Sequence, residues 1–160
     1  LVAGVLCADG TLDAERLREL LAAAGGVPFT CHRAFDVCRD AEAAMDQLVA
    51  LGVARVLTSG QAANALAGAA VIRRLVARAA GRITVLAGAG VRDGNVRELV
   101  VASGVHEVHL SATAWVQSGM AFRRDGVPMG GTAPADDYAL RTTDGAMVAR
   151  VVQALASMRE

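Results

Sequence analysis

The sequence is poor in aromatic residues, which make up 3% of its 160 residues, and its basic residues are all arginine. So few aromatic rings leave no stacking platform for single-stranded nucleic acid. The 16 basic residues are balanced by 16 acidic ones, so no net positive field attracts nucleic acid or an anionic membrane. We therefore expect neither nucleic acid nor a membrane as a partner.

Cysteine is also scarce, with Cys7, Cys31 and Cys38 as an odd set that contains no CxxC pair. This spacing disfavours a disulfide framework and favours the reducing cytoplasm. No signal peptide is recognisable at the start of the chain. Long apolar runs are missing as well, because charges or turn residues interrupt every stretch of about 18 residues, the length that a membrane span needs. We expect a cytoplasmic protein.

What the chain does contain is apolar residues, 54% of the total, enough for one well-packed domain over residues 1–160. Short β-branched runs alternate with long Ala/Leu/Arg segments, which is typical of parallel βα units. The expected strands are residues 1–6, 28–32, 54–58, 82–87 and 105–110. The expected helices are residues 13–24, 40–51, 93–102 and 143–158, and residues 62–80 are expected to contain one more helix, either continuous or broken near Gly68. A long loop over residues 111–141 follows the last strand.

Strands that begin at residues 28, 54, 82 and 105 are evenly spaced, which favours a TIM-like (β/α)₈ barrel over an irregular sheet. Five units cannot close an eight-stranded barrel, which needs about 200–250 residues. The chain also starts at Leu1, within an expected strand and without an initiating Met. We therefore expect an α/β fold with five parallel strands, a barrel lacking about three N-terminal βα units. Its open strand edge favours a homo-oligomer or aggregation.

Polar residues and glycines gather at the carboxyl ends of the expected strands. Barrel enzymes build their sites there, because the βα loops and helix N-termini converge at that end. The residues in question are Asp9, His32, Arg33, Asp36, Thr58, Ser59, Gly60, Gly88, Ala89, Gly90 and Ser111. Their clustering predicts a functional site at this end of the sheet.

Strand alternation indicates which of these side chains point inward. The run V-H-E-V-H-L-S puts Glu107, His109 and Ser111 on one face, with the apolar neighbours toward the helices. The same rule turns Thr30 and His32 inward. Two inward histidines near a carboxylate predict acid–base chemistry, so we take His32, Glu107 and His109 as candidate catalytic residues. The alternative is a satisfied polar network that only fixes the packing of the barrel.

Ligand-binding candidates follow the second and third expected strands. Arg33 can hold a carboxylate or a phosphate, and the alternative is an ion pair between Arg33 and Asp36. Thr58, Ser59 and Gly60 can supply donors at the mouth of the barrel, or they can cap a helix.

Further ligand-binding candidates end the last two expected strands. Barrels often place a phosphate-binding cup of backbone N–H groups there, and Gly88, Gly90 and Ser111 occupy that place. A short glycine run can also do no more than turn a strand into a helix. A phosphate cup and a simple turn both remain open.

The positions of the cysteines indicate whether this chain could bind copper, because Cu(I) prefers thiolate and thioether ligands. Cys31 is predicted to face the helices, Cys38 lies in a loop and Cys7 ends a different strand. Their spacing matches no metal motif, so we assign no metal ligands and treat the cysteines as small buried hydrophobes.

The run F-T-C-H-R-A-F-D at residues 29–36 resembles the signature of the CutC family. The likeness continues over residues 51–60, 81–91, 104–112, 118–123 and 127–131, in the order found in that family. The resemblance implies a TIM-like barrel without its first three strands, and the family name implies copper homeostasis. Two departures stand out. Cys31 replaces a usual Phe, and alanines replace residues of a glycine-rich turn at positions 87 and 89, where a Cβ at Ala89 would crowd the turn if that residue needs a positive φ.

Three hypotheses follow, two that assign a function and one that assigns none. The first is a CutC-like cytoplasmic protein of copper homeostasis, with copper, bound as Cu(I), as the ligand that the resemblance implies. The second is a barrel enzyme for a small anionic or phosphorylated metabolite, with His32 and His109 as acid–base groups. In that enzyme Arg33 and the Gly88–Gly90 turn would hold the anion. The third is a fragment without activity. The expected partner is a small molecule or a metal ion.

Overall fold

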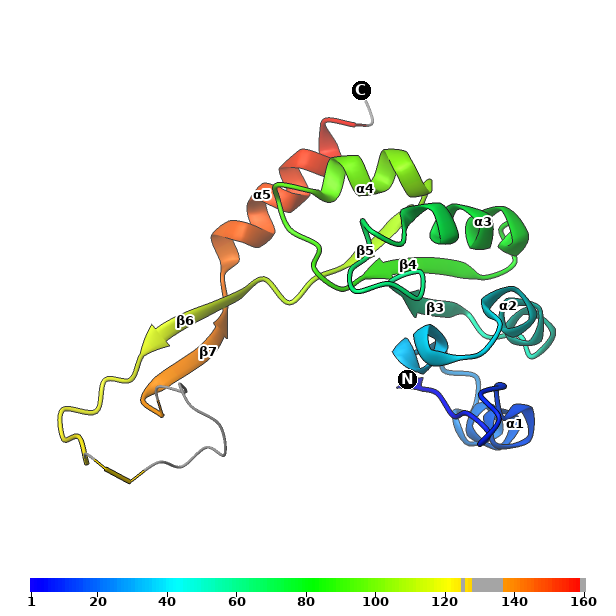
Figure 1. Cartoon of the computed structure of the whole chain (residues 1–160), viewed down its shortest axis with the longest axis horizontal. Helices are drawn as coiled ribbons and strands as arrows, with labels where there is room; N and C mark the ends of the chain where they lie inside the picture. Colours follow the sequence, from blue (N-terminus) through cyan, green and yellow to red (C-terminus); the bar gives the residue numbers. More distant parts are fainter. Residues whose placement is uncertain (125, 128–136, 159–160) are drawn as a thin grey trace.

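The computed structural model describes residues 1–124, 126–127 and 137–158. Strands and helices alternate through most of this part of the chain (Figure 1). In chain order the elements are β1 (Val2–Ala3), α1 (Ala14–Ala23), β2 (Thr30–Cys31), the 3₁₀ helix η1 (Arg33–Val37), α2 (Ala41–Ala50), β3 (Arg55–Thr58), α3 (Ala69–Ala79), β4 (Thr84–Gly88), α4 (Val96–Ser103), β5 (Glu107–His109), β6 (Thr113–Gln117), β7 (Ala139–Thr143) and α5 (Gly145–Ala156).

Strands β1 to β5 form one parallel sheet in sequential order. The prediction of five parallel strands in an α/β fold is therefore confirmed. Sequential order is the arrangement found around a TIM-like barrel. Within the described residues β1 and β5 each pair with one strand, so this sheet is an open arc.

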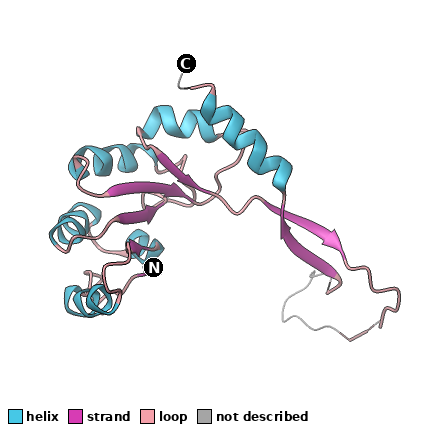
Figure 2. Cartoon of the chain, turned by 180° about the vertical axis from the view of Figure 1, so that it is seen from behind, coloured by secondary structure: helices cyan, strands magenta, loops and turns pink. Residues whose placement is uncertain are grey.

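Helices α1 to α4 cover one side of the sheet (Figures 1 and 2). The strand residues that face them are buried, among them Cys31, Val56 and Val85. The core between the two layers also includes Phe35 and Leu48, each with 0% exposure. The alternate strand residues form the opposite face, which is the inward face of a barrel. No helix in the described ranges combines the length and the apolarity that a bilayer crossing requires.

Local signals explain where the helices begin and end. The carboxylates of Asp13, Asp40 and Asp144 accept hydrogen bonds from first-turn backbone N–H groups of α1, α2 and α5, which satisfies otherwise unpaired donors. Helix α4 ends at Gly104, whose φ of +72° suits a left-handed cap.

The helix expected over residues 62–80 begins only at Ala69. Gly68 packs so closely on the end of β3 that a Cβ there would lie 1.9 Å from the Ser59 carbonyl oxygen. This backbone contact keeps residues 62–67 in a non-helical loop that reaches back to the sheet. Helix α3 therefore starts directly after Gly68.

The prediction of a long loop over residues 111–141 is wrong for two stretches, because β6 and β7 pair there as an antiparallel hairpin. The hairpin projects away from the sheet (Figure 1). Thr, Val and Trp in residues 113–117 suit an extended strand, but the glycines and prolines of the same region hid this signal. Residues 125 and 128–136 of the expected loop lie outside the described residues.

Candidate functional site

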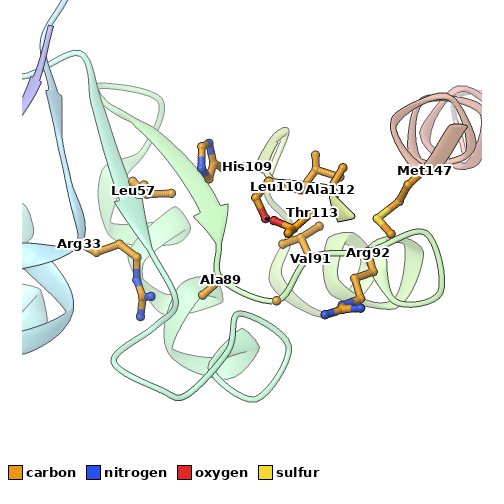
Figure 3. Close-up of a pocket in the computed structure, with 12 residues that line it drawn as sticks. Arg33, Leu57, Ala89, Val91, Arg92, His109, Leu110, Ala112, Thr113 and Met147 are labelled. Atoms are coloured by element: carbon orange, nitrogen blue, oxygen red, sulfur yellow. Dashed lines mark hydrogen bonds between the residues drawn. The ribbon is translucent and has the colours of Figure 1, made fainter. Parts of the chain in front are cut away.

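A cavity of about 360 Å³ opens at the carboxyl ends of β3, β4 and β5 (Figure 3). Four sequence candidates line it: Arg33, Gly90, His109 and Ser111. The loops after β4 and β5 supply most of the remaining lining, and Met147 of α5 closes one side. We call this cavity the mouth. It lies where parallel sheets of this kind place their ligands.

Backbone strain occurs in the loops that follow β3, β4 and β5. Gln61, Ala89 and Ala112 have φ values of +57°, +83° and +43°, and they follow β3, β4 and β5 respectively. L-residues rarely adopt this region, and such conformations cluster at functional sites. A Cβ at Ala89 was expected to crowd the turn if this residue had a positive φ, and its φ is positive. The strain supports the mouth as the functional end of the sheet.

The strain at Ala89 can be measured directly. Ala89→Gly is expected to raise the free energy of unfolding by about 0.5–1 kcal/mol, because glycine tolerates a positive φ without a Cβ clash. Ala87→Gly is the matched control on β4, since Ala87 is buried with an ordinary strand conformation, and it should lower stability by a similar amount. Urea unfolding of both variants checks this, and destabilisation by both would contradict the strain.

Asp36 is the centre of a hydrogen-bonded network below the mouth. Its side chain is 5% exposed and accepts hydrogen bonds from Thr58 Oγ1 at 2.5 Å, the Ser59 N–H at 2.9 Å and Arg33 Nε at 2.6 Å. Burial alone raises the pKa of Asp36, but the hydrogen bonds from Thr58, Arg33 and Ser59 outweigh it and hold the pKa below 3.8. Asp36 is an ionised structural group here.

Arg33 forms the ion pair with Asp36 that the sequence left as an alternative to ligand binding. Its Nη2 also donates to Ser59 Oγ at 2.9 Å. The side chain remains 45% exposed and lines the mouth. Arg33 is thus held in a fixed position with most of its charge compensated.

Thr58, Ser59 and Gly60 serve this network rather than the cavity. Thr58 and Ser59 are fully buried, and Thr58 Oγ1 accepts from the Gly60 N–H at 2.9 Å. A Cβ at Gly60 would lie 2.4 Å from the Gly68 carbonyl oxygen. These residues fix the loop after β3, and none of them lines the mouth.

His32 acts as the N-cap of η1, because its Nδ1 accepts a hydrogen bond from the Ala34 N–H at 3.1 Å. An accepting Nδ1 carries no proton, so the neutral ring holds its proton on Nε2. Strands β3 and β4 separate His32 from His109, a span of about 14 Å along the sheet. The two histidines therefore do not form a direct proton-transfer pair.

Glu107 points to the inward face, as the alternation predicts, but its carboxylate is already paired with an arginine. Arg55 of β3 donates to the Glu107 carboxylate through Nε at 2.8 Å and Nη2 at 3.3 Å. The hydrogen bond and the charge of Arg55 lower the pKa of Glu107. One signal for this partner was missed, since Arg55 stands at an inward position of its strand.

His109 and Gly88 share the inward face at the mouth. A Cβ at Gly88 would lie 2.5 Å from Leu57 Cδ1 and 3.4 Å from His109 Cβ. A side chain at position 88 would therefore displace the end of the Leu57 side chain. His109 itself is exposed and lines the cavity, which leaves its ring available to a bound molecule.

Arg92 is a site residue that the sequence analysis missed. Figure 3 shows its side chain beside the cavity, on the other side of Ala89 from Arg33. Its guanidinium makes no ion pair or hydrogen bond with the described residues, whereas Arg33 makes both. The signal in the sequence that could have identified Arg92 is its position two residues after the Gly88–Gly90 turn.

The cysteines do not form a copper site among the described residues. Cys31 and Cys38 are buried as expected, but Cys7 is exposed, so the expectation of a buried residue is wrong there. Burial raises the pKa of Cys31 to about 12 and raises that of Cys38 as well. Cu(I) binds the deprotonated thiolate. No group of three or more His, Cys, Asp or Glu side chains in the described ranges is arranged to hold a metal ion. The described residues therefore offer no preformed site of three or more such ligands for copper.

Fold and site together define an α/β protein with five parallel strands in sequential order and a candidate site at the carboxyl ends of the strands. The CutC family model matches residues 1–114, and the chain belongs to the CutC family. This confirms the resemblance seen in the sequence motifs.

Relatives show the same assignment. A CutC family protein of Chromobacterium violaceum is 47% identical over 154 residues, covering 96% of this chain and 62% of that protein. A CutC family protein of Citrobacter koseri is 46% identical over 151 residues, covering 94% of this chain and 60% of that protein. The chain thus spans less than two thirds of these relatives.

A solved structure supports the fold. The crystal structure of a Streptococcus agalactiae protein, named as a candidate copper homeostasis protein CutC, matches with a TM-score of 0.65 at 35% sequence identity. The match covers 68% of this chain and 54% of the Streptococcus chain.

Proposed function

We propose that the protein binds a small phosphorylated metabolite at the mouth and acts on it as an enzyme. The observation that carries the proposal is the cavity of about 360 Å³ after β4 and β5, the last two strands of the sheet. Barrels frequently bind phosphate at the loops after their last two strands. The volume is within the range of small-molecule sites.

Donor groups for a phosphate line this cavity. The backbone N–H groups of Gly90 and Val91 make no hydrogen bond to other described residues. Ser111 Oγ accepts from Thr113 Oγ1 at 2.9 Å, which leaves the Ser111 hydroxyl proton for an acceptor. Arg92 adds a positive charge that is not paired with any acid in the described part of the chain. Together these groups have the chemistry that a phosphate requires.

The proposed acid–base residue is His109. It lines the cavity and forms no ion pair with an acid of the described residues, unlike Glu107, which pairs with Arg55. An imidazole at the mouth can donate or accept a proton near neutral pH. His32 has a positioning role in this proposal, because its Nδ1 caps the helix that presents Arg33.

Thermal stabilisation tests the proposal. Sugar phosphates and inorganic phosphate are expected to raise the Tm of the chain, with about 2.7 kcal/mol of stabilisation at a hundred times Kd. Arg92→Gln should reduce the shift. Arg74→Gln is the matched control, because Arg74 lies outside the mouth and pairs with Glu42. A cooperatively melting chain whose Tm responds to no phosphorylated compound would refute the proposal.

Copper handling in the cytoplasm is the second candidate function. Its support is the name of the Streptococcus relative and, for the cytoplasm, the set of free cysteines. A Cu(I) titration against a chromogenic chelator distinguishes it. Binding that is lost in a variant with Cys7, Cys31 and Cys38 all replaced by serine would favour copper, whereas unchanged chelator signal would count against it.

A further inference from the structure

The two arginines at the mouth differ in their electrostatic state. Arg33 donates to Asp36 at 2.6 Å, and Asp36 is 5% exposed and ionised. The pair is therefore close to neutral as seen from the cavity. Arg92 has no such partner among the described residues, and it lines the same cavity from the other side of Ala89 (Figure 3). One end of the mouth is thus cationic and the other is polar but nearly neutral.

We infer that the ligand is a phosphate monoester of a hydroxylated carbon skeleton, with one charged end and one uncharged polar end. This inference rests on the proposed function and specifies its substrate class. The phosphate lies at Arg92, the Gly90 and Val91 N–H groups and Ser111. The hydroxyl or carbonyl end lies at Arg33, whose remaining guanidinium protons can donate to a neutral oxygen.

A second anionic group at the Arg33 end is disfavoured by Asp36. Its carboxylate lies 2.6 Å from Arg33 Nε, so an incoming carboxylate meets an already compensated charge and a like charge close by. Leu57 and Val91 also line the cavity, and their apolar side chains suit the carbon skeleton. The charge pattern therefore favours one phosphate over two acidic groups.

Glycerol 3-phosphate and 3-phosphoglycerate test this inference, because both have three carbons and one phosphate and differ in a hydroxymethyl against a carboxylate group. Isothermal titration calorimetry of the whole chain should give a Kd for glycerol 3-phosphate about tenfold lower than for 3-phosphoglycerate, which corresponds to about 1.4 kcal/mol. Equal affinity, or tighter binding of 3-phosphoglycerate, would overturn the inference.

Two variants test the separate roles of Arg92 and Arg33 in ligand binding. Arg92→Gln should weaken glycerol 3-phosphate binding by about 10- to 100-fold, because it removes a charge-assisted bond to the phosphate. Arg33→Gln should weaken it less, by about threefold to tenfold, as expected for a neutral hydrogen bond. A larger loss in Arg33→Gln would overturn the assignment. If neither compound nor inorganic phosphate binds the folded wild-type chain, the proposed function itself fails.

Discussion

Replacing Phe35 with alanine is expected to lower the free energy of unfolding by about 3–5 kcal/mol, the cost of a large cavity in a packed core. Phe35 has 0% exposure and lies in η1, which contacts both β3 and α2. The same short helix carries Arg33 and Asp36, so phosphate binding at the mouth should weaken in parallel. Urea unfolding followed by circular dichroism measures the first effect, and calorimetric titration measures the second.

Phe122→Ala is the matched control for this prediction. Phe122 is 60% exposed and lies after β6, away from the sheet. The same substitution there should change stability by no more than about 0.5 kcal/mol. Similar losses at the two positions would mean that the burial of Phe35 does not determine its contribution.

The sheet could be predicted because its signals are local. Alternation in residues 105–111 put Glu107 and His109 on the inward face, and their contacts with Arg55 and Gly88 agree with that placement. Turn glycines and aspartate caps likewise marked most helix ends. These patterns depend on neighbouring residues, which a sequence displays directly.

The partners of the polar residues could not be predicted, because they lie far apart in the sequence. Asp36 is bonded to Thr58 across 22 positions, and Glu107 to Arg55 across 52. Composition identified these groups as unusual but did not say whether a ligand or another side chain would satisfy them. The approach of Gly68 to Ser59, which delays α3, is a long-range contact of the same kind.

The exposure of Arg92 could not be predicted from the sequence either. Arginine is common in this chain, and many arginines pair with acids on helix surfaces, as Arg78 does with Asp46. Only the three-dimensional structure separates Arg92, which has no ion-pair partner among the described residues, from arginines in surface ion pairs. The candidate site therefore changed in composition while its location remained the one that strand ends predict.

Asp36→Ala is expected to lower the free energy of unfolding by about 3 kcal/mol at neutral pH, because it leaves buried donors without an acceptor. The Thr58 hydroxyl and the Ser59 N–H both lose their bonds to this carboxylate. Asp46→Ala is the matched control, since Asp46 pairs with Arg78 on the surface with a side chain 52% exposed, and it should cost less than about 1 kcal/mol. Urea unfolding of both variants makes the comparison, and equal costs would contradict a structural role for the Asp36 network.

The contribution of Asp36 should disappear in acid, and the sign follows from its lowered pKa. A carboxyl group whose folded pKa lies below its unfolded value stabilises the protein above that unfolded value, here 3.8, and loses the contribution as the pH falls through the folded pKa. The difference in unfolding free energy between wild type and Asp36→Ala should stay constant from about pH 7 to 5 and shrink below about pH 4. Asp13 and Asp93 also have lowered pKa values, but they are present in both proteins and cancel in the difference. A difference that is as large at pH 3 as at pH 7 would show that the ionised carboxylate is not what holds Arg33 and the loop after β3 in place.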